Sequence, residues 1–127
     1  MQPNNIKIAV WFELPAADFA RAVTFYQNIF GFEIVTMELA GLKQGLFPHD
    51  EKSLVSGAIV CGMDYKPSKD GSMIYLNGGD DLSSVLAKVS TAGGSVLLPK
   101  THLGEEIGYI AHFLDSEGNR VGLHSMQ

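Results

Sequence analysis

The sequence contains a single cysteine, Cys61. A disulfide within the chain is therefore excluded, and a zinc site built from cysteine thiolates is not expected. The chain also lacks a charged-then-apolar leader and any apolar run near the roughly 18 residues of a membrane-spanning helix. From these absences we expect a cytoplasmic protein with no membrane partner.

Basic residues are also few. Lysine and arginine together number 9 against 14 aspartate and glutamate residues, which gives a net charge of −5. The basic residues are spread along the chain, whereas nucleic-acid binding requires a basic face that neutralises phosphates. The sequence therefore argues against a nucleic-acid partner. Its hydrophobic content of 46% over 127 residues is typical of one globular domain with a substantial core.

The first half of the chain contains a predicted amphipathic helix. From Phe19 to Phe30, apolar residues recur with the i, i+3, i+4, i+7 spacing of a helix that buries one face. Asp18 can accept hydrogen bonds from the free backbone N–H groups at the start of this helix. Gly31 can end it, because glycine adopts a left-handed conformation at little cost.

The second half of the chain repeats this pattern. Asp81 and Gly94 stand where Asp18 and Gly31 stand in the first copy, and a second helix is predicted over residues 80–92. The two copies share their pattern of apolar residues, cap and stop, but few identical residues. The repeat indicates two modules of the same architecture.

The remainder of the chain is predicted to form strands joined by turns. The expected strands are residues 6–14, 32–39, 42–47, 54–62, 73–77, 95–99, 108–114 and 121–124. Residues 40–41 predict a tight hairpin, and residues 102–107 a loop. Residues 115–119 predict a turn in which the Asp115 side chain binds its own downstream backbone.

Each half thus has the order β-α-β-β-β, or nearly so. Module one covers about residues 6–62 and module two about residues 72–125, with residues 64–71 as the segment most like a linker. The predicted fold class is α+β, in one domain over residues 1–127, with curved sheets that carry their helices on one side.

Several short motifs in this order resemble a known family. They are residues 11–15 (WFELP), Asp18-Phe19, Phe25-Tyr26, residues 30–32 and the closing stretch 111–119. The closing stretch resembles the Asp-Pro-x-Gly-Asn turn of the vicinal oxygen chelate superfamily, with Ser116 in place of the proline. That superfamily includes glyoxalase I, bleomycin-resistance proteins and extradiol dioxygenases, and this chain most resembles its small glyoxalase-related branch. The resemblance implies two βαβββ modules around a cup-shaped cavity, and a homodimer.

The resemblance also implies a divalent metal held by side chains from four strands, which would stabilise an enolate or oxyanion as a Lewis acid. Carried over by position, the ligands would be Trp11, Ile74, Gly122 and either Ser56 or Ala58. Indole, aliphatic and glycyl groups offer no lone pair to a cation. We therefore predict no metal cofactor at these positions.

A different set of residues is expected to line the cup. The predicted pocket residues are Trp11, Glu13, Ile74, Tyr75, His112, Gly122 and His124. Under one hypothesis the protein binds a small molecule, with Trp11 as an aromatic surface on which a flat or apolar ligand stacks. Sequestration of a toxic compound, as the resemblance to bleomycin-resistance proteins implies, is one version of this hypothesis.

Two other hypotheses remain open. The protein could be a lyase, isomerase or dioxygenase with Glu13 and His124 as catalytic residues. Such an enzyme would use either a relocated metal, with His112 as a further ligand, or Glu13 as a general base without metal. Alternatively, the chain could serve protein association, since the family commonly pairs modules between chains.

Overall fold

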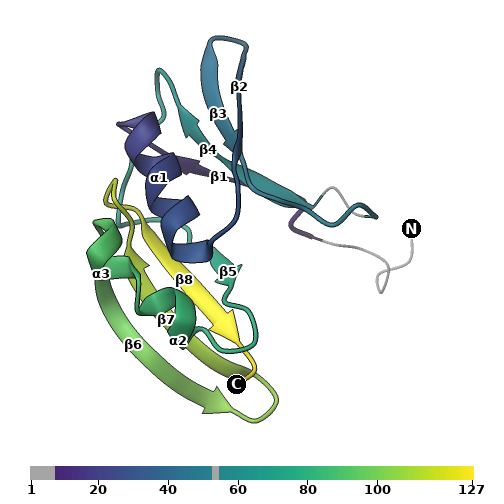
Figure 1. Ribbon diagram of the computed structural model, residues 1–127. Helices are drawn as coiled ribbons and strands as arrows, with labels where there is room; N and C mark the ends of the chain where they lie inside the picture. The colour runs from purple at the N-terminus through teal and green to yellow at the C-terminus, as the bar shows by residue number, and fades with distance from the viewer. Residues whose placement is uncertain (1–7, 53–54) are drawn as a thin grey trace.

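The computed structural model describes residues 8–52 and 55–127 as two four-stranded sheets, one from each half of the chain (Figure 1). The first sheet, in the order β1-β4-β3-β2, consists of β1 (Trp11–Pro15), β2 (Val35–Leu39), β3 (Leu42–Leu46) and β4 (Ser56–Cys61). The second sheet, in the order β5-β8-β7-β6, consists of β5 (Tyr75–Asn77), β6 (Ser95–Gly104), β7 (Gly108–Leu114) and β8 (Arg120–Ser125).

The two sheets share one pairing scheme. In each, the strand before the helical segment pairs in parallel with the last strand of its half, and the other pairs are antiparallel. The predicted α+β class with two curved, unclosed sheets is confirmed. The predicted strand starts at residues 6 and 54 lie outside the described residues. Residues 8–10 precede β1, whose pairing with β4 begins where Trp11 lies beside Ser56.

The first helix, α1 (Phe19–Phe30), has the predicted ends. The Asp18 carboxylate accepts a hydrogen bond from the Arg21 N–H at 3.1 Å, and Gly31 closes the helix with φ 76°. The predicted hairpin after β2 is also present, because Ala40 and Gly41 both have positive φ. These features depend on local backbone geometry and can therefore be predicted from the sequence.

The predicted second helix is wrong as a single element. The chain instead forms two one-turn helices, α2 (Ser83–Leu86) and α3 (Val89–Ala92). The break falls at Lys88, whose N–H donates to Val85, three residues back, as in a tighter helical turn. Asp81 accepts from the N–H of Ser83 and from the ammonium of Lys100, both at 2.9 Å.

Strand β6 is longer than predicted. It extends through Gly104, so the loop predicted over residues 102–107 is wrong for its first part. Thr101 and His102 pair with Ile110 and Tyr109 across the hairpin, after two irregularities in register. Because β6 is an edge strand, its proline does not interrupt the sheet.

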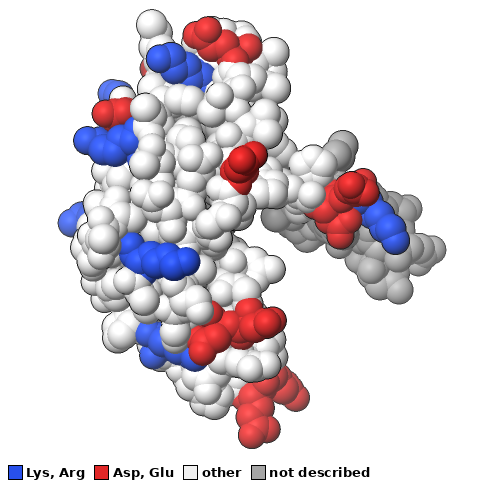
Figure 2. Space-filling model, in the orientation of Figure 1, with Lys and Arg blue, Asp and Glu red and all other residues white. Residues whose placement is uncertain are grey.

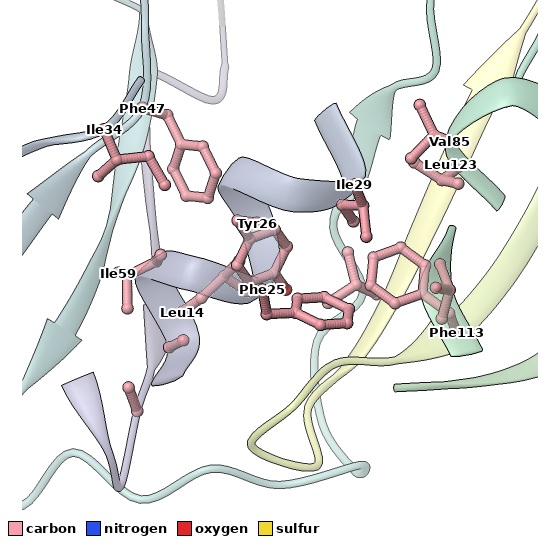
Figure 3. Close-up of a cluster of buried hydrophobic side chains, with 14 of the residues drawn as sticks. Leu14, Phe25, Tyr26, Ile29, Ile34, Phe47, Ile59, Val85, Phe113 and Leu123 are labelled. Carbon is pink, nitrogen blue, oxygen red and sulfur yellow. The ribbon is translucent and has the colours of Figure 1, made fainter. Parts of the chain in front are cut away.

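One hydrophobic core joins both halves, and α1 lies at its centre. Figure 3 shows Phe25 and Tyr26 between Phe47 of the first half and Phe113 of the second. The Tyr26 ring centroid lies 5.4 Å from that of Phe47 and 6.4 Å from that of Phe113. Packing of α1 therefore fixes the first sheet relative to the second.

The predicted turn between β7 and β8 reinforces this join. Asp115 accepts hydrogen bonds from the backbone N–H groups of Glu117 and Asn119, as predicted, and also from the buried Tyr26 hydroxyl at 2.7 Å. Burial and the Asp115 carboxylate raise the pKa of Tyr26 well above its ordinary value. Asn119 donates to the carbonyl of Pro15 at 2.7 Å. The turn of the second half thus holds the end of β1 in place.

Charge and helix length add two observations. On the face shown in Figure 2, Lys and Arg side chains lie scattered and form no basic patch. No helix in the described part of the chain is long and apolar enough to cross a bilayer.

Candidate functional site

The candidate site lies where β1 and β5 approach each other. Among the described strands, β1 pairs only with β4 and β5 only with β8, so each has an edge outside its sheet. Of the hollows that open there, two are lined by predicted pocket residues, and each of these two is lined by residues of both halves. The first, about 310 Å³, is called the tryptophan hollow, and its lining includes Trp11, Phe12, Met73, Ile74, Tyr75 and Leu76. The second, about 200 Å³, is called the glutamate hollow, and its lining includes Glu13, Lys66, Asp70, Ile74, Asn119 and Arg120.

The tryptophan hollow is mostly apolar and has two large aromatic side chains at its surface. Trp11 is 46% exposed and Tyr75 is 45% exposed. Each lies on a strand next to the junction, and Ile74 lies between the two hollows because it lines both. A concave apolar surface with rigid aromatic rings suits a flat small molecule.

A row of hydrogen bonds crosses the second sheet beside this hollow. Tyr75, Gly122 and His112 lie in register on β5, β8 and β7. The Tyr75 hydroxyl oxygen lies 2.6 Å from His112 Nε2, and Arg120 Nη2 lies 3.0 Å from His112 Nδ1. Burial and the nearby Arg120 guanidinium lower the pKa of His112, which favours neutral imidazole.

Gly122 makes room for this arrangement. A side-chain carbon at residue 122 would collide with the ring of Tyr75. The glycine therefore lets the aromatic ring lie flat against β8, with its hydroxyl reaching His112. The absence of a side chain at residue 122 has a specific packing reason.

The glutamate hollow is polar. Glu13 accepts a hydrogen bond from the Tyr65 hydroxyl at 3.1 Å, and that bond raises the pKa of Tyr65. Lys66 and Asp70 belong to the segment predicted as a linker, so this segment forms one wall of the hollow. Arg120 forms part of another wall and connects the hollow to His112.

Three of the predicted pocket residues, His112, Gly122 and His124, line neither hollow. His124 lies near the end of β8. Its Nε2 lies 2.6 Å from the carbonyl oxygen of Ile107, and it pairs with Asn77 and Ile110 across neighbouring strands. Neither hollow is lined by His124, so neither brings it together with Glu13. Over residues 8–52 and 55–127, no three His, Cys, Asp or Glu side chains gather in a group that could hold a metal ion.

Sequence reasoning missed Arg120. Residues 120, 122 and 124 alternate along β8 and therefore share one face, which the predicted strand start at residue 121 concealed. A signal was present, because a basic residue stood two positions before a predicted pocket glycine. Its contact with His112 required knowledge of the pairing between β7 and β8.

Comparisons with known proteins add a family match. The family model described as Glyoxalase/Bleomycin resistance protein/Dioxygenase superfamily matches residues 8–123. A glyoxylase-like domain-containing protein of Didymella fabae is 29% identical over 110 residues, which cover 84% of each chain.

Solved structures share the fold. A fosfomycin resistance protein of Listeria monocytogenes, FosX, superposes with a TM-score of 0.67 at 18% identity, over 94% of this chain and 90% of the other. A glyoxalase I variant of Zea mays superposes with a TM-score of 0.69 at 17% identity, over 91% of this chain. The match covers 46% of the maize chain, so this chain spans about half its length.

Proposed function

Because the chain belongs to the glyoxalase/bleomycin resistance protein/dioxygenase superfamily, we propose that it binds a small molecule in the tryptophan hollow. The observation that carries the proposal is Trp11, a half-exposed indole at an apolar concavity between the two halves. Tyr75 presents a second ring to the same concavity. These groups suit a ligand with an aromatic or apolar body.

The proposed binding is independent of a divalent metal. The positions to which the resemblance assigns metal ligands hold Trp11, Ile74, Gly122 and Ser56 or Ala58, and these residues do not fit a metal. Of these side chains only the Ser56 hydroxyl has a donor oxygen, and it bonds to the carbonyls at residues 47 and 48. The ring of Tyr75 covers the glycine of the set.

A role in resistance is one form of this function. The Listeria protein is by name a fosfomycin resistance protein, and the family name includes bleomycin resistance. A chain that holds a toxic compound in its hollow would lower the free concentration of that compound. The proposal includes a cytoplasmic location, where such a compound would be sequestered.

Tryptophan fluorescence tests the proposal directly, because Trp11 is the single tryptophan of the chain. A panel of aromatic acids, amides and alcohols is titrated into the protein with excitation at the red edge of indole absorption. We expect a saturable change in emission, weakened by Tyr75→Ala and unchanged by Met63→Ala, an exposed site. If no compound perturbs Trp11 emission, binding in this hollow is overturned.

An enzymatic function is the second candidate, and Glu13 is the observation that favours it. Its carboxylate lines the glutamate hollow together with Arg120, so a bound substrate could meet a base and a cation side by side. The discriminating measurement is exchange of carbon-bound protons for deuterium in compounds that bind. Exchange that depends on Glu13 would favour an enzyme, and binding without exchange favours the binder.

A homodimer belongs to the same proposal. Val35, Met37 and Leu39 alternate along β2 and therefore share one face, with exposed fractions of 63%, 43% and 58%. Burial of such a face against a second copy would remove apolar surface from water. Light scattering coupled to size exclusion measures the assembly, and a monomer at all concentrations would contradict the dimer.

A further inference from the structure

The hydrogen-bonded row formed by Arg120, His112 and Tyr75 ends at a residue, Tyr75, that belongs to the lining of the tryptophan hollow. Arg120 lies 3.0 Å from one ring nitrogen of His112, and Tyr75 lies 2.6 Å from the other. Tyr75 also lines the hollow. The row therefore connects a positive charge on β8 with the hydroxyl of Tyr75, whose ring extends from β5 across Gly122 toward His112 on β7.

The direction of each hydrogen bond follows from the donor inventory. A guanidinium donates only, so His112 Nδ1 accepts from Arg120. A neutral imidazole carries one proton, which must then be on Nε2, the nitrogen facing Tyr75. His112 consequently donates to the Tyr75 oxygen. If Tyr75 donated to Nε2 instead, the imidazole proton would be on Nδ1 and would face the N–H donor of Arg120.

This direction leaves the hydroxyl proton of Tyr75 available. Its oxygen already accepts from His112, and no other side chain of the described residues forms a hydrogen bond with that hydroxyl. A hydroxyl that accepts a hydrogen bond becomes a stronger donor through polarisation of the chain. The hydroxyl hydrogen that is available for donation belongs to a side chain that is 45% exposed.

Arg120, at one end of the row, carries a positive charge. The ion pairs of the described residues join Arg21 to Glu117 and Lys100 to Asp81, and neither uses Arg120. Glu13 lines the glutamate hollow, beyond Ile74, and accepts from Tyr65. A negative group beside Tyr75 would thus meet a polarised donor backed by an unpaired cation.

We propose that the Tyr75 hydroxyl is the donor that recognises a carboxylate on an aromatic ligand whose ring contacts Trp11. This inference rests on the proposed function and narrows it to a ligand class, small aromatic carboxylates. His112 and Arg120 are positioning residues, because they orient and polarise the hydroxyl without touching the ligand. Gly122 supplies the space in which the Tyr75 ring lies.

The first test uses benzoate and benzamide, which have nearly the same size and differ in charge. Each is titrated into the full chain while Trp11 emission is followed. We expect benzoate to bind about tenfold more tightly than benzamide, the usual effect of a hydrogen bond to a charged group. Tyr75→Phe should remove this preference, because benzoate loses a hydrogen bond to a charged group whereas benzamide loses at most a weaker, neutral one.

Tyr109→Phe is the matched control. Tyr109 lies on β7 near Lys100 and His102, outside the lining of both hollows, so the loss of its hydroxyl should leave the preference intact. Arg120→Gln should reduce the preference with the Tyr75 hydroxyl still present. Circular dichroism of each variant confirms that the fold is retained.

The second test needs no ligand. Nitrogen-15 spectra of the imidazole rings report which nitrogen carries the proton, and we expect the neutral Nε2–H form for His112 near neutral pH. In Arg120→Gln we expect this preference between the two neutral forms to weaken. A protonated Nδ1 in the native chain would overturn the inference whatever the titrations show.

The outcomes separate the inference from the proposed function. If both probes perturb Trp11 equally and Tyr75→Phe changes neither, the hollow binds small molecules and the carboxylate inference is wrong. If neither probe binds while another compound of the panel does, the proposed function stands and the inference is again wrong. If no compound binds at all, both are overturned.

Discussion

Gly122 lies against the aromatic ring of Tyr75, with which it pairs across β8 and β5. The first half contains the same relationship, since a side-chain carbon at Gly57 would collide with the ring of Phe12, its neighbour across β4 and β1. Each glycine leaves room for an aromatic ring from the parallel strand beside it. Only the ring on Gly122 carries a hydroxyl.

Gly122→Ala should displace the Tyr75 ring and break its hydrogen bond with His112. We expect a loss of about 1–3 kcal/mol in the free energy of unfolding, the usual cost of overpacking, together with weaker benzoate binding. Denaturant unfolding and Trp11 emission measure the two effects. Gly57→Ala is the matched control, with a similar loss of stability. It displaces Phe12, which lines the tryptophan hollow, so it should weaken both probes alike and leave the preference for benzoate over benzamide unchanged. Equal effects of the two variants on that preference would contradict the role of the Tyr75 ring.

Tyr26→Phe should destabilise the join between the halves. The variant removes the buried hydroxyl that donates to Asp115 and leaves the other hydrogen bonds of that carboxylate in place. We expect a loss of about 1–3 kcal/mol in the free energy of unfolding, measured in urea. Tyr65→Phe removes a hydroxyl that bonds to Glu13 near the surface and should cost less stability than Tyr26→Phe. A Tyr26→Phe variant as stable as the native chain would show that the join rests on other contacts.

Acid stability should depend on Glu117. Burial raises the pKa of this carboxyl. The hydrogen bonds from Arg21 and from the backbone N–H of Asp18 together lower the pKa by more than burial raises it, so the net pKa lies below the ordinary 4.5. A lowered pKa in the folded state stabilises the fold above the unfolded value, and this contribution is lost as pH falls through the folded value.

Stability should therefore decline on acidification below about pH 4.5. Glu117→Gln should lower stability near neutral pH by about 1.5–3 kcal/mol, because its hydrogen bonds are charge-assisted. The same variant should make the acid decline shallower. Thermal unfolding between neutral and acidic pH measures both effects, and an unaltered slope in the variant would assign the acid decline to other carboxyl groups.

Ligand binding should survive removal of metal ions. After purification without chelator, we expect elemental analysis to find less than one equivalent of any transition metal, and addition of a chelator to leave the Trp11 titration unchanged. Glu13→Ala and His124→Ala should not alter the metal content. Stoichiometric metal that disappears in either variant would overturn metal-independent binding and favour the enzyme hypothesis.

The site residues show how far sequence patterns reach. Alternation along a strand indicates that Trp11 and Glu13 share a face, and the structure places both at the junction with β5, in separate hollows. To predict whether Glu13 and His124 come together, the distance between the two sheets must be known, and no local sequence pattern contains that distance. Arg120 contacts His112 because of the register between β7 and β8, and the sequence did not specify that register.

The sequence by itself determined the features that depend on a few neighbouring residues. These are α1 with its ends at Asp18 and Gly31, the hairpin at residues 40–41, and the turn at residues 115–119, because backbone sterics and short-range hydrogen bonds decide them. Only the tertiary structure decided the break at Lys88, the length of β6 and the two hollows between β1 and β5. Those features depend on packing and strand pairing between distant segments, whose geometry is set when α1 joins both halves in one core.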